Sequence, residues 1–194
     1  MRKFLISTVV VFLLIATTRA QDRESLVELF GGYSYLNFDL ANGPLIGAGR
    51  QNGHGVGLNV AANLNERLGI VGDFSFNARD VAIPIFGGIK GEARNIYFLF
   101  GPRLSARSER RTVFGHVLVG AFIARDEFGR INKSTDVALG IGGGLDVNVS
   151  RTVAIRAFQL DYLPSRAAFG FNEEKAWLHN FRAQFGVVLK LGRK

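Results

Sequence analysis

The sequence predicts an all-β protein, an eight-stranded antiparallel up-and-down transmembrane β-barrel. Three observations predict this fold class. Apolar and polar residues alternate with period two in eight segments, and the spacers between these segments alternate between short and long. After residue 20 no apolar stretch approaches the roughly 20 residues that a membrane-spanning helix needs. A chain of 194 residues is suited to one domain.

The first 20 residues are typical of a cleaved secretory signal peptide. Arg2 and Lys3 form a basic start, residues 4–15 are an apolar core, and Ala20 is a small residue suited to signal peptidase. The alternative, a membrane anchor, is disfavoured because the apolar core is too short to span a bilayer. We therefore expect residues 1–20 to be a signal peptide and residues 21–194 to be the outer-membrane barrel domain.

The composition excludes several classes of function. The chain carries 24 basic and 16 acidic residues, and the signal segment holds three of the basic ones, so the mature chain has 21 against 16 and a net charge of +5. These charges are scattered rather than gathered in a stripe, so no nucleic-acid partner is expected. The chain has no cysteine, which excludes disulfides and thiolate metal sites. We expect no cofactor and no metal site, since the three histidines are far apart in the sequence.

Most of the predicted strands are segments in which one face is apolar and the other polar. In the last segment Trp177 and Phe181 lie on the apolar face and Arg182 on the polar face. Segment 153–162 changes parity midway, and a β-bulge near Phe158 would return Gln159 to the polar side. Segments 95–104 and 113–124 are apolar on both faces, so their orientation stays open. The eight predicted strands are 27–38, 54–63, 68–77, 95–104, 113–124, 137–149, 153–162 and 177–191.

The alternation alone would also fit a soluble lipocalin-type barrel with an apolar interior. Three features favour the membrane barrel. The polar face holds mainly Gly, Ser, Asn and Ala, whereas a water-facing exterior would be rich in Lys and Glu. Aromatic residues lie near the strand ends, as an interfacial girdle requires. The spacers 39–53, 78–93, 125–136 and 164–176 are long and the spacers between them are short, as in barrels with long extracellular loops.

Seven titratable residues are predicted to face the barrel interior. One interpretation is a conducting polar path, and the other is a packed salt-bridge network that fills the lumen. An eight-stranded interior has little spare volume and buried charges must be paired, which favours the filled lumen. Arg182 is expected to bridge to Glu28 or to Asp161, because the strands that carry them adjoin the last strand. The predicted lumen network is Glu28, Asp73, His116, Asp146, Arg156, Asp161 and Arg182.

The sequence offers no convincing catalytic set. Nucleophilic hydrolysis needs a nucleophile within reach of an oriented base, and His54, His116 and His179 are the candidate bases. None has a serine two positions further on, which would be the next residue on the same side of a strand. We therefore expect no enzyme activity and no catalytic residue, with a lipid A-modifying enzyme as the alternative.

Four stretches together resemble the small OmpA-like outer-membrane β-barrel family of Gram-negative bacteria: "VELFGGYSYLNFD", "GIGGGLDVNV", "AIRAFQLDYL" and "FRAQFGVVLKLG". The resemblance covers nearly all of the mature chain. It implies an eight-stranded, porin-like domain in the cell outer membrane without a peptidoglycan-binding domain. The closing stretch is similar to the insertion signal that the outer-membrane assembly machinery recognises, matched by Gln184, Gly186, Leu189 and Leu191.

The long spacers are the remaining functional candidates. The apolar stretch 83–89 could contact a partner or lipid headgroups, or fold over the barrel mouth. Arg125, Arg130, Lys133 and Arg166 could meet lipopolysaccharide phosphates or be solvated loop charges. We expect a monomer with a mostly filled polar lumen that has a structural or interaction role through its extracellular loops, with a small pore as the alternative. The expected partners are outer-membrane lipid, lipopolysaccharide and the assembly machinery.

Overall fold

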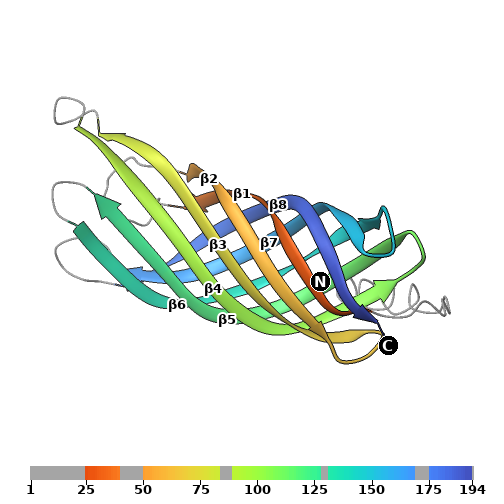
Figure 1. Ribbon diagram of the computed structural model, residues 1–194. Coiled ribbons are helices and arrows are strands. Elements are labelled where there is room, and N and C mark those ends of the chain that lie inside the picture. The colour runs from red at the N-terminus through yellow and green to blue at the C-terminus, as the bar shows by residue number, and fades with distance from the viewer. Residues whose placement is uncertain (1–24, 40–49, 84–88, 128–130, 169–174, 194) are drawn as a thin grey trace, which may run out of the picture.

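The protein is a closed antiparallel β-barrel, described by a computed structural model for residues 25–39, 50–83, 89–127, 131–168 and 175–193. Each strand pairs with the next along the chain, and β8 pairs with β1 to close the barrel (Figure 1). This confirms the predicted fold class. The predicted signal peptide 1–20 lies outside the described residues. The strands are β1 (Ser25–Asp39), β2 (Arg50–Asn63), β3 (Leu68–Ile83), β4 (Ile89–Arg107), β5 (Arg111–Glu127), β6 (Ile131–Asn148), β7 (Val153–Ala168) and β8 (Lys175–Arg193).

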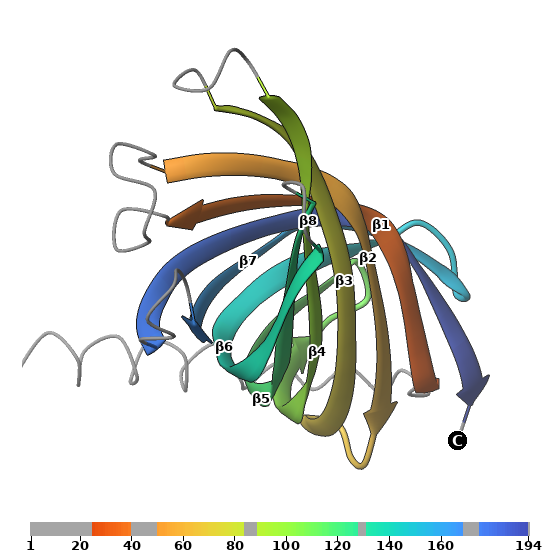
Figure 2. The ribbon, with the colours of Figure 1, turned by 90° about the vertical axis from the view of Figure 1, so that its left-hand side faces the viewer.

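The strands are longer than the sequence predicts, and most of the extra length lies at one end of the barrel. The short turns 64–67, 108–110 and 149–152 lie at the end where β1 begins and β8 ends, and we call this the turn end (Figures 1 and 2). At the opposite, loop end, pairing of β3 with β4 continues to Ile83 opposite Ile89. The predicted spacers 78–93 and 125–136 are therefore largely strand.

Side chains alternate between the barrel interior and an apolar exterior. On β2, Asn59 is buried, whereas Val56, Leu58 and Val60 on the other face are 52%, 51% and 53% exposed. The other strands expose Leu, Val, Ile and Phe in the same way. Such a surface is unfavourable in water and favourable in hydrocarbon, and barrel closure leaves no unpaired strand edge. The barrel therefore has the surface of a protein that spans a membrane. No helix among the described residues is long and apolar enough to cross one.

The predicted bulge in β7 is confirmed. Leu145 on β6 pairs with Phe158, but the next residue, Asp146, pairs with Arg156, so Ala157 is the extra residue. The bulge returns Gln159 to the interior, where it is buried. The structure also orients the two strands that the sequence left open. Burial alternates so that odd-numbered residues of β4 from 95 to 105 and even-numbered residues of β5 from 112 to 124 face inward.

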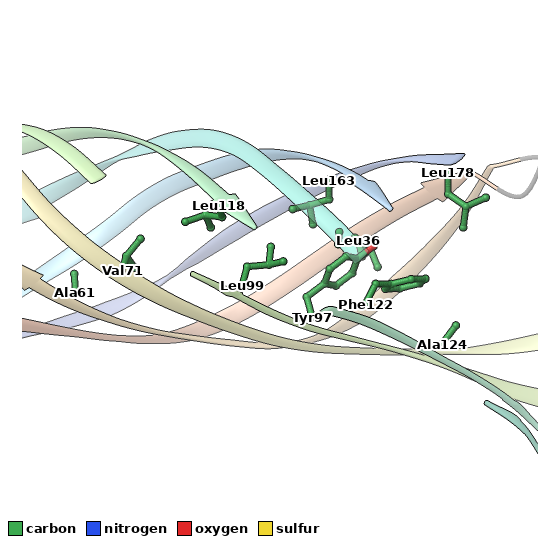
Figure 3. Close-up of a cluster of buried hydrophobic side chains, with 11 residues drawn as sticks. Leu36, Ala61, Val71, Tyr97, Leu99, Leu118, Phe122, Ala124, Leu163 and Leu178 are labelled. Atoms are coloured by element: carbon green, nitrogen blue, oxygen red, sulfur yellow. The ribbon is translucent and has the colours of Figure 1, made fainter. Parts of the chain in front are cut away.

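Part of the interior is apolar, which differs from the polar lumen that the sequence predicts. On β5 and β7, Leu118 and Leu163 follow the buried residues His116 and Asp161 at the next inward position toward the loop end. Figure 3 shows these leucines pointing into the barrel with Leu36, Leu99 and the Tyr97 ring. We call the set the apolar interior cluster: Leu36, Ala61, Val71, Tyr97, Leu99, Leu118, Phe122, Ala124, Ala138, Leu163 and Leu178.

We predict that an arginine is costly on the outer face and tolerated at the turn end. Val119→Arg, near the middle of β5, should lower the free energy of unfolding by about 2–4 kcal/mol, because it would bring a charge into hydrocarbon. Leu64→Arg, in the turn between β2 and β3, should cost at most about 1 kcal/mol. Urea unfolding of the protein refolded in lipid vesicles measures both values. Equal costs for the two variants would contradict the membrane placement of this exterior.

Candidate functional site

The most highly organised polar site is a buried ion-pair network, and Arg182 on β8 is its most fully bonded member. Its Nη1 and Nη2 atoms donate to the two carboxylate oxygens of Asp73 at 2.6 and 2.9 Å. Its Nε and Nη2 donate to Oδ2 of Asp161 at 3.0 and 2.8 Å, and Nη1 also donates to Ser75 Oγ at 2.8 Å. All five guanidinium N–H groups of Arg182 are thus hydrogen-bonded. A lysine could not reproduce this planar set of bonds.

Arg156 on β7 is held both by hydrogen bonds and by aromatic rings. Its Nε and Nη2 donate to the two carboxylate oxygens of Asp146 at 2.8 and 3.2 Å, and its Nη1 donates to Gln159 Oε1 at 2.6 Å. The guanidinium carbon lies 4.2 Å from the centre of the Phe30 ring and 4.5 Å from that of Phe114. Contact with two aromatic faces stabilises a cation that burial has removed from water.

The network continues toward the turn end through Arg103 on β4. Its Nη1 lies 3.0 Å from Glu28 Oε2, its Nη2 lies 3.6 Å from Asp146 Oδ2, and its guanidinium carbon lies 4.1 Å from the centre of the Phe114 ring. Arg107, which is partly buried, places its Nη2 3.4 Å from Glu28 Oε1. The glutamate carboxylate is therefore shared between two guanidinium groups.

Two amides join these contacts into one continuous system. Asn59 accepts a hydrogen bond from Arg156 and donates one to Asp73. Gln159 donates to Asp161 at 2.8 Å, and His116 Nε2 lies 2.8 Å from the other oxygen of that carboxylate. The charges balance at four carboxylates and four guanidinium groups. The network consists of Glu28, Asn59, Asp73, Arg103, Arg107, His116, Asp146, Arg156, Gln159, Asp161 and Arg182.

The structure brings together the seven residues that the sequence assigns to the lumen. All seven are buried, and each has an ionic or hydrogen-bonded partner within the network. Arg182 contacts Asp161, one of its two expected partners, whereas Glu28 pairs with Arg103 instead. Arg103 was not predicted from the sequence, although an arginine within a strand whose outer face meets lipid is expected to face inward, and this would have oriented β4.

The four residues of the predicted insertion signal lie on both faces of the closing strand. Gln184 is buried, and its amide lies over Gly57, where an added Cβ would come within 2.1 Å of Gln184 Nε2. Gly186 pairs with Gly32 across the seam between β8 and β1. Leu189 and Leu191 are exposed on the outer face. Their recognition by the assembly machinery stays a prediction.

The remaining candidate residues either lie on the outer face or fall outside the residues whose side chains are described. His54 pairs with Tyr33 and His179 with Tyr162 on the outer face, so neither of these histidines is bonded to a serine. Arg166 is exposed on β7. Segment 84–88, Arg130 and the side chains of Arg125 and Lys133 lie outside the described residues. In the part of the chain that is described, no group of three or more His, Asp or Glu residues is arranged to hold a metal ion.

An apolar exterior, a closed eight-stranded sheet and a charged interior together define an outer-membrane-type β-barrel protein. Comparison with solved structures supports this class and confirms the resemblance at the level of fold. Neisserial surface protein A superposes with a TM-score of 0.60 at 14% identity, covering 86% of this chain and 98% of that one. Ail, the attachment invasion locus protein of Yersinia pestis, solved in complex with the heparin analogue sucrose octasulfate, gives 0.56 at 16% identity, covering 87% and 99%.

A third barrel extends the comparison to another genus. The outer membrane protein OprG from Pseudomonas aeruginosa gives a TM-score of 0.55 at 11% identity, covering 87% of this chain and 97% of that one. No protein-family model matches the sequence, and no curated protein matches it either. At these identities the likeness assigns the fold, and the function has to be argued from the residues of this chain.

We predict that the network depends on Arg182 for charge balance. Arg182→Met should lower the free energy of unfolding by about 3–5 kcal/mol, because it leaves the carboxylates of Asp73 and Asp161 buried without their cation. The triple variant Asp73→Asn, Asp161→Asn, Arg182→Met should recover part of this loss, since it removes the uncompensated charges. Urea unfolding in vesicles compares the variants. A triple variant less stable than Arg182→Met would contradict this account.

Proposed function

We propose that the protein is an outer-membrane barrel that is closed to ions and acts as a structural or interaction protein, not as an enzyme. The observation that carries this proposal is that the interior holds two barriers in series. The charged network spans the interior from Glu28 to Arg182, and most of the apolar interior cluster, all but Ala61 and Val71, lies on its loop side. An ion on this path would have to displace paired charges and then pass these apolar side chains, which lie among buried, hydrogen-bonded polar residues such as Asn77, Ser165 and Asn180.

The interaction role is assigned to the loop end. Strand pairing continues there beyond the polar and apolar layers of the interior, to Glu127 opposite Ile131 as well as to Ile83 opposite Ile89. Exposed connecting segments on a rigid scaffold are where proteins commonly contact partners, which favours the loop end as the region of contact. Recognition of its last strand by the assembly machinery and a monomeric state are parts of the same proposal.

A small pore is the second candidate, and one observation favours it. Among the described residues, Thr112 Oγ1 and both polar atoms of the Gln184 amide are buried without a hydrogen-bonding partner in the protein. Buried polar atoms usually bond to ordered water when no protein partner exists. Thr112 lies on the turn side of the network and Gln184 beside it, so these sites alone do not cross the apolar interior cluster.

We predict that the folded protein shows no ion conductance in a planar lipid bilayer, and that the apolar interior cluster is what blocks the ions. The variant Asp73→Asn, Asp161→Asn, Arg182→Gln should also be silent, because the cluster remains. Replacing Leu118 and Leu163 with serine should produce conductance steps, since the loop half of the interior would then hold water.

Insertion is checked by the heat-dependent shift in electrophoretic mobility of folded barrels. Reproducible steps from the wild-type protein, absent in protein-free controls, would overturn the closed interior in favour of the pore. Steps from the network variant alone would locate the barrier in the ion pairs rather than in the apolar cluster.

A further inference from the structure

We propose that the outer face of the barrel carries a binding site for the phosphate group of a phosphorylated glycolipid of the lipid A type. The site lies across β8, β1 and β2 near their loop ends, and it rests on the membrane placement proposed above. We call it the rim patch and define it by Asn37, Arg50, Asn52, His54, His179 and Phe181.

The first argument is the depth of the patch. On β8, Leu189 and Trp177 both face outward, 12 positions apart. A strand rises about 3.3 Å per residue and tilts by about 40° in such barrels, so these residues are separated by roughly 30 Å along the membrane normal. This matches the thickness of the hydrocarbon core. If Leu189 lies near its inner edge, Trp177 and the patch beside it lie at the outer headgroup layer.

The second argument is the geometry of Arg50. Its Nε donates to Asn37 Oδ1 at 2.6 Å and its Nη2 donates to the His179 carbonyl oxygen at 3.1 Å, so the side chain reaches from β2 across β1 to β8. The guanidinium carbon lies 5.1 Å from the centre of the Phe181 ring. Asn37 is itself fixed by donating to Asn52 Oδ1 at 2.7 Å. An exposed guanidinium held by two neighbouring strands places a fixed cation at the barrel surface, and arginine is a residue that commonly binds phosphate.

The third argument is the polar character of the surrounding outward side chains. His54 pairs with the Tyr33 hydroxyl, and His179 pairs with the Tyr162 hydroxyl and stacks on its ring with 6.0 Å between centroids. These groups supply hydrogen-bonding atoms beside Arg50, and Arg166 adds a second exposed cation opposite Trp177 in the strand register.

The patch joins three neighbouring strands, β8, β1 and β2, above an apolar surface. Directly below the patch, Tyr33 packs on Phe185 with 5.0 Å between centroids, and the apolar exterior continues toward the turn end. A polar cationic site above an apolar surface fits a lipid with a phosphorylated headgroup and acyl chains. A water-soluble anion has no acyl chains that would contact that apolar surface.

The chain contains its own reporter for this site, because Trp177 is its single tryptophan and lies beside the patch. The refolded full-length protein in maltoside micelles would be titrated with diphosphoryl lipid A while the fluorescence of Trp177 is followed. We expect saturable binding that is lost with the dephosphorylated lipid. Arg50→Gln should raise the dissociation constant by about tenfold, as expected for loss of a charged hydrogen bond.

Two further variants make the result specific. Arg110→Gln removes an exposed arginine from the turn at the opposite end of the barrel and should leave the dissociation constant unchanged. Asn37→Leu keeps the charge of Arg50 but removes its anchor, so it should weaken binding less than Arg50→Gln does. It also tests the site independently should Arg50→Gln not fold, which the electrophoretic mobility shift reports.

Equal weakening by Arg50→Gln and Arg110→Gln would overturn the site in favour of general charge attraction. Equal binding of the phosphorylated and dephosphorylated lipids would overturn the role of phosphate. The assay does not depend on conductance, so an open lumen would refute the proposed closed interior while leaving the result for the rim patch unaffected.

Discussion

The pairing of β8 with β1 is the constraint on which the rest of the structure depends. In lipid every backbone N–H and C=O group must be bonded within the protein, and closing the sheet meets that requirement without leaving an edge. Closure with eight strands fixes an interior only wide enough for side chains. The period of two along each strand then sends half of the side chains into that space. Glycines such as Gly57 leave room for long side chains inside the barrel, here the amide of Gln184.

The narrow interior explains why the buried charges form one network rather than separate pairs. Burying an ion is costly unless opposite charges and hydrogen bonds replace its water. Arg182 meets this condition by using all five donors, and Arg156 meets it with a carboxylate, two amides and two aromatic rings. Because Asn59 and Gln159 each touch both a guanidinium and a carboxylate, the two ion-pair clusters constrain each other's positions. Rigidity follows from shared partners as well as from the strength of single bonds.

The sequence was sufficient for the fold and for part of the interior. Period-two alternation located all eight strands, and the parity change in segment 153–162 located the bulge that returns Asp161 to the interior. The contacts between side chains of different strands depend on how neighbouring strands are offset, which the sequence of one strand does not show. No pattern within one strand states that Arg103 approaches Glu28, or that Leu118 and Leu163 meet in the same layer. The extra strand length at the loop end was missed because the period-two pattern of the sequence does not continue into segments 78–93 and 125–136.

Polar groups inside the barrel and polar groups on its outer face have different explanations. This contrast suggests that the function lies on the outer face. Inside, polar side chains are explained by one another, since a charge such as Asp73 is matched by Arg182 and needs no ligand. Outside, Arg50, His54 and His179 are hydrogen-bonded to neighbouring outward residues, but such polar groups would be costly in hydrocarbon. They lie together where the strands leave the hydrocarbon. The rim patch is therefore better explained by what surrounds the barrel than by the barrel itself.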